Sequence, residues 1–92
     1  PYMFQENTYS EFQIAANFNG KVFDYRIDML VSKDDEVMII DFKSYSVPNI
    51  TSDIKKQMRI YKNIICNMFP DKTISCYILW TEANILEKIT IN

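Results

Sequence analysis

The residues best suited to chemistry in this sequence are Asp41 and Lys43, two positions apart at the end of the apolar stretch 38–43 (Met-Ile-Ile-Asp-Phe-Lys). Such a stretch is typical of a buried strand, in which alternate side chains point to the same face. A carboxylate and an ammonium group therefore leave one face together. Burying either group without a partner costs roughly several kcal/mol, so charges are seldom placed there for packing. The two residues are either an ordinary ion pair at a strand end or part of an active site.

A second carboxylate, Asp28, comes from the strand predicted over residues 22–32. The polar segment Lys33-Asp34-Asp35-Glu36 predicts a tight turn, and a loop of residues 34 and 35 would place Asp28 directly opposite Asp41. At roughly 4 Å and an effective dielectric near 20, two carboxylates repel by on the order of 4 kcal/mol. A cation there would offset the repulsion. Because the turn lacks the Gly that two-residue loops prefer, a slipped register is the alternative.

The pattern around these residues predicts the elements that position them. Residues 1–8 have mixed signals and stay unassigned. The predicted order of elements is strand, strand, strand, helix, strand. The first three strands are Tyr9–Ala16, Val22–Ser32 and 38–43, with a turn at 17–20 that contains the only Gly and a loop at 44–49. The helix is capped by Thr51 or Ser52 and reaches about Phe69; the last strand is Thr73–Thr81, followed by a weaker terminal element over Asn84–Asn92.

Two of these elements have clear faces. In the second strand, alternation predicts one face with Tyr25, Ile27, Met29 and Val31, and another with Asp24, Arg26, Asp28 and Leu30. The helix has an apolar stripe typical of packing on a sheet, formed by Ile54, Met58, Tyr61, Ile64, Ile65 and Met68. Its basic residues Lys55, Lys56, Arg59 and Lys62 form either a solvated surface or a DNA track.

Composition excludes several classes of protein. Ninety-two residues with 48% hydrophobic and 24% charged content predict one folded domain, 1–92, which begins without Met and is expected to be cut from a longer chain. No membrane span or signal peptide is found, so a soluble cytoplasmic protein is expected. A net charge of −2 argues against binding nucleic acid chiefly through a basic surface. Cys66 and Cys76 are either buried thiols or a disulfide, and the absence of His excludes Ser-His-Asp triads and the usual zinc sites.

Several spaced motifs resemble the PD-(D/E)xK nuclease superfamily, in particular the C-terminal nuclease domain of AddA/RecB-type helicase–nucleases. They are Glu11, Tyr25-Arg26-Ile27-Asp28, Ile39-Ile40-Asp41-Phe42-Lys43-Ser44, Gln57-x-x-x-Tyr61 and the strand Cys76–Thr81. The departures are Tyr25, where the family usually has Gly, and Phe42 in place of Tyr. The family also has a metal-binding His upstream of the matched region. This chain has no His, so we expect it to be inactive or very weak alone.

The resemblance implies an α/β restriction-endonuclease-like core with a mixed sheet and a packed helix. It implies a Mg²⁺- or Mn²⁺-dependent DNA exonuclease in double-strand break repair, with the helicase portion of the same chain and a second nuclease/helicase subunit as partners. Asp28, Asp41 and the Phe42 backbone carbonyl would hold the metal, a hard cation that takes oxygen ligands. Lys43 would orient or deprotonate the attacking water, or stabilise negative charge on the phosphate.

The remaining site residues are singled out by the same resemblance. Glu11 would assist from the neighbouring strand, or is a solvated edge residue. Gln57 and Tyr61 stand one helical turn apart and would bind phosphate or Lys43, although Tyr61 is equally expected to serve packing. The alternative functions are a stand-alone restriction- or resolvase-type nuclease, and a catalytically silent DNA-positioning or structural module.

Overall fold

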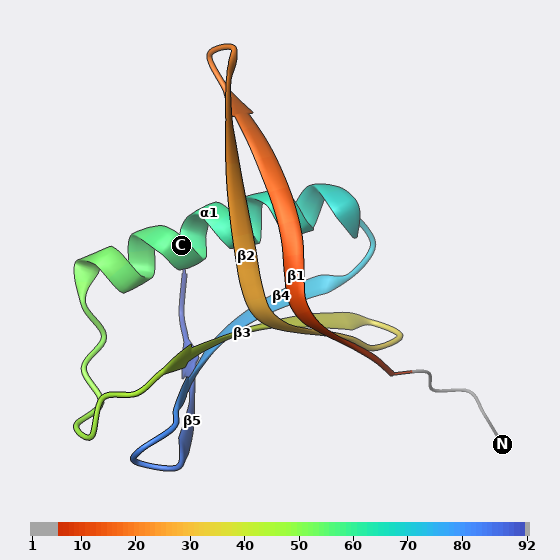
Figure 1. The fold of residues 1–92 in the computed structure, drawn as a ribbon. Coiled ribbons are helices and arrows are strands. Elements are labelled where there is room, and N and C mark those ends of the chain that lie inside the picture. The colour runs from red at the N-terminus through yellow and green to blue at the C-terminus, as the bar shows by residue number, and fades with distance from the viewer. Residues whose placement is uncertain (1–5, 92) are drawn as a thin grey trace, which may run out of the picture.

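The chain folds into a five-stranded mixed sheet with one helix across a face of it (Figure 1). The structure is a computed structural model that describes residues 6–91. The strand order in the sheet follows the chain, and only β3 and β4 pair in parallel, joined by residues 44–72 with the helix among them. The elements are β1 (Asn7–Phe18), β2 (Lys21–Ser32), β3 (Glu36–Lys43), α1 (Ser52–Met68), β4 (Thr73–Trp80) and β5 (Ile85–Ile89).

The predicted elements are all present, with shifts of a few residues at their ends. β1 begins at Asn7, inside the segment left unassigned, and residues 1–5 lie outside the described range. The weak terminal element contains β5, which pairs antiparallel with β4. The prediction of an α/β fold with a mixed sheet and one packed helix is confirmed.

The β2–β3 hairpin has the predicted register. The backbone N–H of Lys33 donates to the carbonyl of Glu36 at 2.7 Å, which leaves residues 34 and 35 as the loop. Pairing runs from Ser32 with Val37 to Met29 with Ile40 and stops there, one pair short of Asp28 and Asp41. The two aspartates therefore face each other where the ladder opens.

The ladder opens because β1 and β2 turn a corner. Glu11 has a φ of 52°, and the pair that it would form with Asp28 is missing from an otherwise continuous β1–β2 register. Between this corner and the turn that connects them, the two strands bend away from β3 and rise past α1 (Figure 1). A left-handed backbone at a residue other than Gly is costly and typically marks such local bends.

The corner overturns one sequence-based expectation. Strict alternation places Ile27 and Leu30 on opposite faces of β2, yet both are fully buried in the same core cluster. At the corner the alternation of inward- and outward-facing side chains is interrupted, because the two halves of the strand lie against the core in different orientations. Sequence alternation assumes a continuous pleat, which β2 does not have.

Helix α1 packs its predicted apolar stripe on the sheet. Ile54, Met58, Tyr61 and Ile65 are buried, whereas Met68, also expected there, is 49% exposed at the last turn. The Thr51 hydroxyl accepts from the backbone N–H of Ile54 at 3.2 Å and caps the helix, as predicted. This packing aligns the first turns of α1 with the end of β3, where Asp41 and Lys43 lie.

Candidate active site

Asp41 and Lys43 form an ion pair at the end of β3. The Nζ atom of Lys43 lies 3.0 Å from Oδ2 of Asp41, and only 8% of the Asp41 side chain is exposed. Among residues 6–91 this buried oxygen has a charge partner but no hydrogen bond of good geometry. An ionised oxygen with unused lone pairs in a buried position is costly for the fold, and such groups often mark functional sites.

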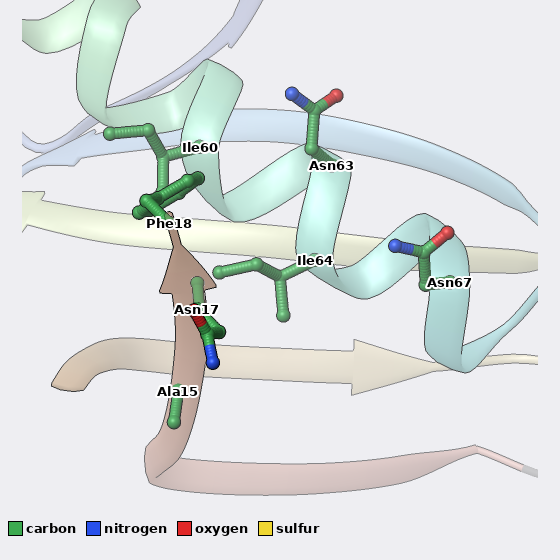
Figure 2. A pocket seen from close by; sticks show the side chains of 8 residues that line it. Ala15, Asn17, Phe18, Ile60, Asn63, Ile64 and Asn67 are labelled. Atoms are coloured by element: carbon green, nitrogen blue, oxygen red, sulfur yellow. The ribbon is translucent and has the colours of Figure 1, made fainter. Parts of the chain in front are cut away.

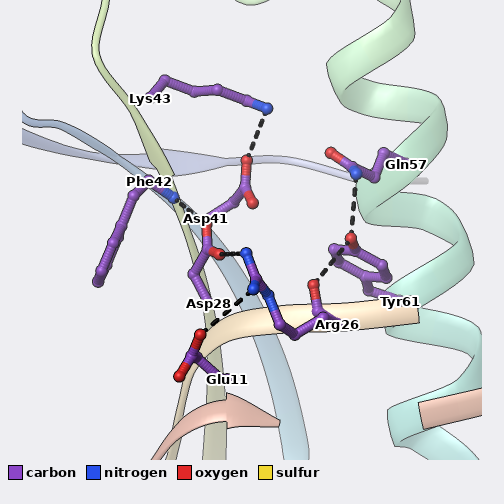
Figure 3. Close-up of polar contacts among 8 residues, drawn as sticks. All are labelled: Glu11, Arg26, Asp28, Asp41, Phe42, Lys43, Gln57 and Tyr61. Carbon is purple, nitrogen blue, oxygen red and sulfur yellow. Dashed lines mark hydrogen bonds and ion pairs between the residues drawn. The ribbon is translucent and has the colours of Figure 1, made fainter. Parts of the chain in front are cut away.

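Asp28 lies beside Asp41 because β2 leaves β3 at that point. The Oδ2 atom of Asp28 accepts from the backbone N–H of Phe42 at 2.8 Å, in the place of a ladder carbonyl. Figure 3 shows the Asp28 and Asp41 side chains next to each other, with Lys43 on one side and Arg26 on the other. The corner thus converts a paired strand residue into a carboxylate that is anchored to the neighbouring strand.

Arg26 links Glu11 to Asp28. Its guanidinium donates to Oε1 of Glu11 at 3.2 Å and lies 3.7 Å from Oδ1 of Asp28. The Glu11 side chain is 71% exposed, so its pair with Arg26 contributes little to stability. Glu11 is therefore connected to Asp28 through the guanidinium of Arg26, and within residues 6–91 its carboxylate forms no direct contact with Asp28 or Asp41.

Gln57 and Tyr61 face the site from α1. The amide nitrogen of Gln57 donates to the Tyr61 hydroxyl at 3.0 Å, and that hydroxyl donates to the backbone carbonyl of Arg26 at 3.2 Å. Tyr61 is 3% exposed and its ring also packs edge-on against Tyr25. Tyr61 therefore joins the helix to β2 just before Asp28, and Gln57 fixes its hydroxyl.

An open cavity of about 470 Å³ lies between Lys43 and the start of α1. It is lined by Lys43, Tyr45, Thr51, Asp53, Ile54 and Gln57. Its volume falls within the ~300–1,000 Å³ usual for small-ligand pockets. A ligand in this cavity would contact the Lys43 ammonium and the Gln57 amide together.

Burial and neighbouring charges change the acidity of two groups here. Burial, followed by the adjacent Asp28 carboxyl, raises the pKa of Asp41, while Lys43 opposes that rise. Burial also raises the pKa of Tyr61, and the negative charges of Asp41 and Asp28 add to this effect. Both shifts arise first from burial, and the neighbouring carboxylates add to them, as expected where negative charge is partly removed from water.

The donor set fits a small hard cation. Two adjacent carboxylates, one with an unsatisfied buried oxygen, are the ligands that Mg²⁺ and Mn²⁺ prefer. Over residues 6–91, however, no group of three or more His, Cys, Asp or Glu side chains is arranged to hold a metal ion. Any cation would therefore take its other ligands from backbone carbonyls, water or substrate.

The structure brings together most residues that the sequence singled out. Asp28, Asp41, Phe42 and Lys43 are in contact or adjacent, and Gln57 and Tyr61 join them through the backbone of Arg26. The sequence alone indicates no role for Arg26. Its position two residues before Asp28 was the available signal, because side chains two apart share a strand face.

Sequence comparisons do not identify this chain: no protein-family model matches it, and no curated protein is detectably similar. Within residues 6–91, the helix is too short and too polar to span a membrane.

Proposed function

We propose that this domain is a metal-dependent DNA nuclease that hydrolyses phosphodiester bonds. The observation that carries the proposal is the pair of adjacent aspartates at the mouth of the opened β2–β3 ladder, with Lys43 3.0 Å from one of them. This arrangement supports the motif resemblance because Asp28, Asp41 and Lys43, which come from two different motifs, meet at one place. A restriction-endonuclease-like fold is part of the same proposal.

The residues of the site would divide between binding the metal ion and binding the phosphate. Asp28 and Asp41, with the backbone carbonyl of Phe42, would hold Mg²⁺ or Mn²⁺, which when bound supplies an acidified water and a Lewis acid for the phosphate. Lys43 borders the open cavity and would orient the attacking water or stabilise charge on the phosphate. Gln57 lines the same cavity and would contact the phosphate.

The wider role follows from the resemblance alone. We propose an exonuclease domain of an AddA/RecB-type helicase–nuclease in double-strand break repair, with DNA, the helicase portion and a second subunit as partners. Glu11 would assist at the site only if Arg26 released it, because the two now form an ion pair.

Metal binding by the 92-residue chain tests the proposal. At ten times its Kd, Mn²⁺ would stabilise the fold by about 1.4 kcal/mol, which raises Tm by roughly 5–10 °C for a domain of this size. Asp41→Asn should abolish this rise. Asp71→Asn is the matched control, because Asp71 is exposed in the turn after α1. An equal rise in both variants would refute a metal site at Asp41.

Cleavage is the second test, measured on end-labelled DNA with protein in excess over hours. Wild-type chain with Mn²⁺ should cut weakly, and Asp41→Ala should not cut while keeping its circular dichroism spectrum. Retained cutting by Asp41→Ala would show that the activity has another origin.

A catalytically silent module is the second candidate. It is favoured by the Arg26–Glu11 pair and by the lack of a three-group metal cluster over residues 6–91. Absence of both metal binding and cutting in the wild-type chain would decide for this candidate.

A further inference from the structure

The outer end of the β1–β2 hairpin exposes aromatic rings to solvent. Phe18 and Phe23 are 47% and 38% exposed, and their ring centroids lie 5.7 Å apart with the rings tilted by 53°. The Nζ atom of Lys21 lies 5.5 Å from the centre of the Phe23 ring. Exposed rings grouped with a cation at a projecting end of a fold are typical of an interaction surface.

A cavity of about 370 Å³ separates this hairpin end from α1. Figure 2 shows Phe18 against Ile60, with Asn63 and Asn67 projecting from the helix beside Ile64. Ala15, Ala16 and Asn17 complete the lining. The cavity therefore has apolar side chains, one aromatic ring and three side-chain carboxamides, and none of the described residues that line it is charged.

The carboxamides are available to a ligand. The side chains of Asn63 and Asn67, one helical turn apart, have no hydrogen-bond partner in the described part of the chain, and both residues are exposed. The oxygen of Asn17 accepts from the backbone N–H of Gly20 at 2.9 Å, which leaves its amide NH₂ group as a donor. Donors and acceptors of this kind match the edges of nucleobases.

We propose that this cavity binds an unpaired base of a single-stranded nucleic acid. The base would stack on Phe18 and hydrogen-bond to Asn63 and Asn67, while Lys21 and Lys56 would contact phosphates; Lys56 is exposed one turn before Ile60 on the same helix face. An apolar protein segment fits less well, because it would cover the carboxamides without pairing them. The inference goes beyond the proposed nuclease function and stands without it.

The distance from the cavity to the candidate active site corresponds to a few nucleotides of single strand. Residues 21–28 of β2 run from the hairpin end to Asp28, which corresponds to roughly 23 Å at ~3.3 Å per strand residue. A few nucleotides of extended strand would cover that span. A base held in the cavity would therefore hold the strand near Asp28.

The test titrates isotopically labelled chain with single-stranded DNA decamers, in EDTA and low salt so that nothing is cut. The side-chain amide signals of Asn63 and Asn67 should shift on addition of DNA. Phe18→Ala should weaken binding by roughly 5- to 150-fold, the range that loss of one stacked base gives. Leu86→Ala, at a 50% exposed position on β5, is the matched control and should bind like wild type.

Asn67→Asp provides a second variant at an exposed position, where unfolding is not expected. It should weaken binding because it removes the amide donor offered to the base and adds a negative charge to the cavity. Unchanged binding in both Phe18→Ala and Asn67→Asp would overturn the inference. So would signals at the cavity that shift with protein concentration and not with DNA, which would identify a protein contact. Binding is measured here in EDTA and without cutting, whereas the nuclease proposal is tested by Mn²⁺ binding without DNA, so failure of one is distinguishable from failure of the other.

Discussion

Asp28 supports both the fold and the candidate site. Its carboxylate takes the place of a ladder carbonyl by accepting from the backbone N–H of Phe42, and it adds negative charge next to Asp41. The two roles can be separated, because an Asn side chain retains an acceptor oxygen without the charge.

We therefore predict that two substitutions at this position have different effects on the free energy of unfolding. Asp28→Ala should lower the free energy of unfolding by about 1–2 kcal/mol, since the Phe42 N–H loses its partner. Asp28→Asn should leave it unchanged or raise it, because repulsion with Asp41 is relieved, and should weaken Mn²⁺ binding. Urea unfolding with and without Mn²⁺ measures both effects. Equal destabilisation by the two variants would mean that the charge, and not the hydrogen bond, matters to the fold.

Cys76 predicts a pH dependence of stability. Burial raises the pKa of this thiol from 9.0 to about 11. Between these values the unfolded chain binds fewer protons at Cys76 than the folded chain, so stability falls as pH rises through this window. The contribution lost by pH 10.5 is about 2 kcal/mol.

Urea unfolding at pH 8 and pH 10.5 checks this prediction. Cys76→Ala should lose less stability than wild type over the interval, and Cys66→Ala, which changes the partly buried thiol on α1, should resemble wild type. Identical pH dependence in all three proteins would contradict the assignment to Cys76.

At the scale of elements, the corner in β1 and β2 decides the geometry of the site. It depends on Glu11 at a φ of 52°, a conformation that costs roughly 1–3 kcal/mol for a residue other than Gly. The bend opens the ladder and so gives Asp28 access to Phe42.

We predict that Glu11→Gly leaves stability unchanged or raises it by about 1 kcal/mol, because Gly adopts positive φ without strain. The matched control is Gln13→Gly, two residues along the same strand and also exposed, which should cost about 0.5–1 kcal/mol since its φ is negative. Urea unfolding of both variants measures the difference. A loss at Glu11 as large as that at Gln13 would show that the corner is not strained.

Much of this arrangement was predictable from the sequence, and the corner was not. Alternating apolar residues and the polar turn at 33–36 define the β2–β3 register, and Thr51 followed by an apolar stripe defines α1. Glu11 carries no signal for a left-handed backbone, unlike Gly or Asn. The bend has no local sequence pattern, so the Arg26–Glu11 pair and the burial of both Ile27 and Leu30 could not be predicted.

Over the whole molecule, stability is unevenly distributed. Among the described residues, β3, β4 and the buried face of α1 hold most of the fully buried side chains. The end of the β1–β2 hairpin, between Ile14 and Tyr25, is mostly exposed. Local opening requires little free energy where few apolar contacts are lost.

We predict that backbone amides between Ala15 and Phe23 exchange hydrogen much faster than those of β3 and β4. Hydrogen exchange followed by NMR measures this. Bound single-stranded DNA should slow exchange in the hairpin end and leave β3 unaffected. Equal protection of the two regions without DNA would contradict a locally unstable hairpin.

The parallel pairing of β3 with β4 has a kinetic consequence. The β2–β3 hairpin contains only local contacts and can form early, but β4 must close the long connection through α1 before it reaches β3. The carbonyl of Lys43 accepts from the backbone N–H of Thr81 at 2.8 Å, so the backbone at the end of β3 gains this hydrogen bond only in that late step. A chain arrested before it would have both aspartates on a formed hairpin, but Lys43 would still lack this anchor. We therefore expect the candidate site to be completed at the end of folding.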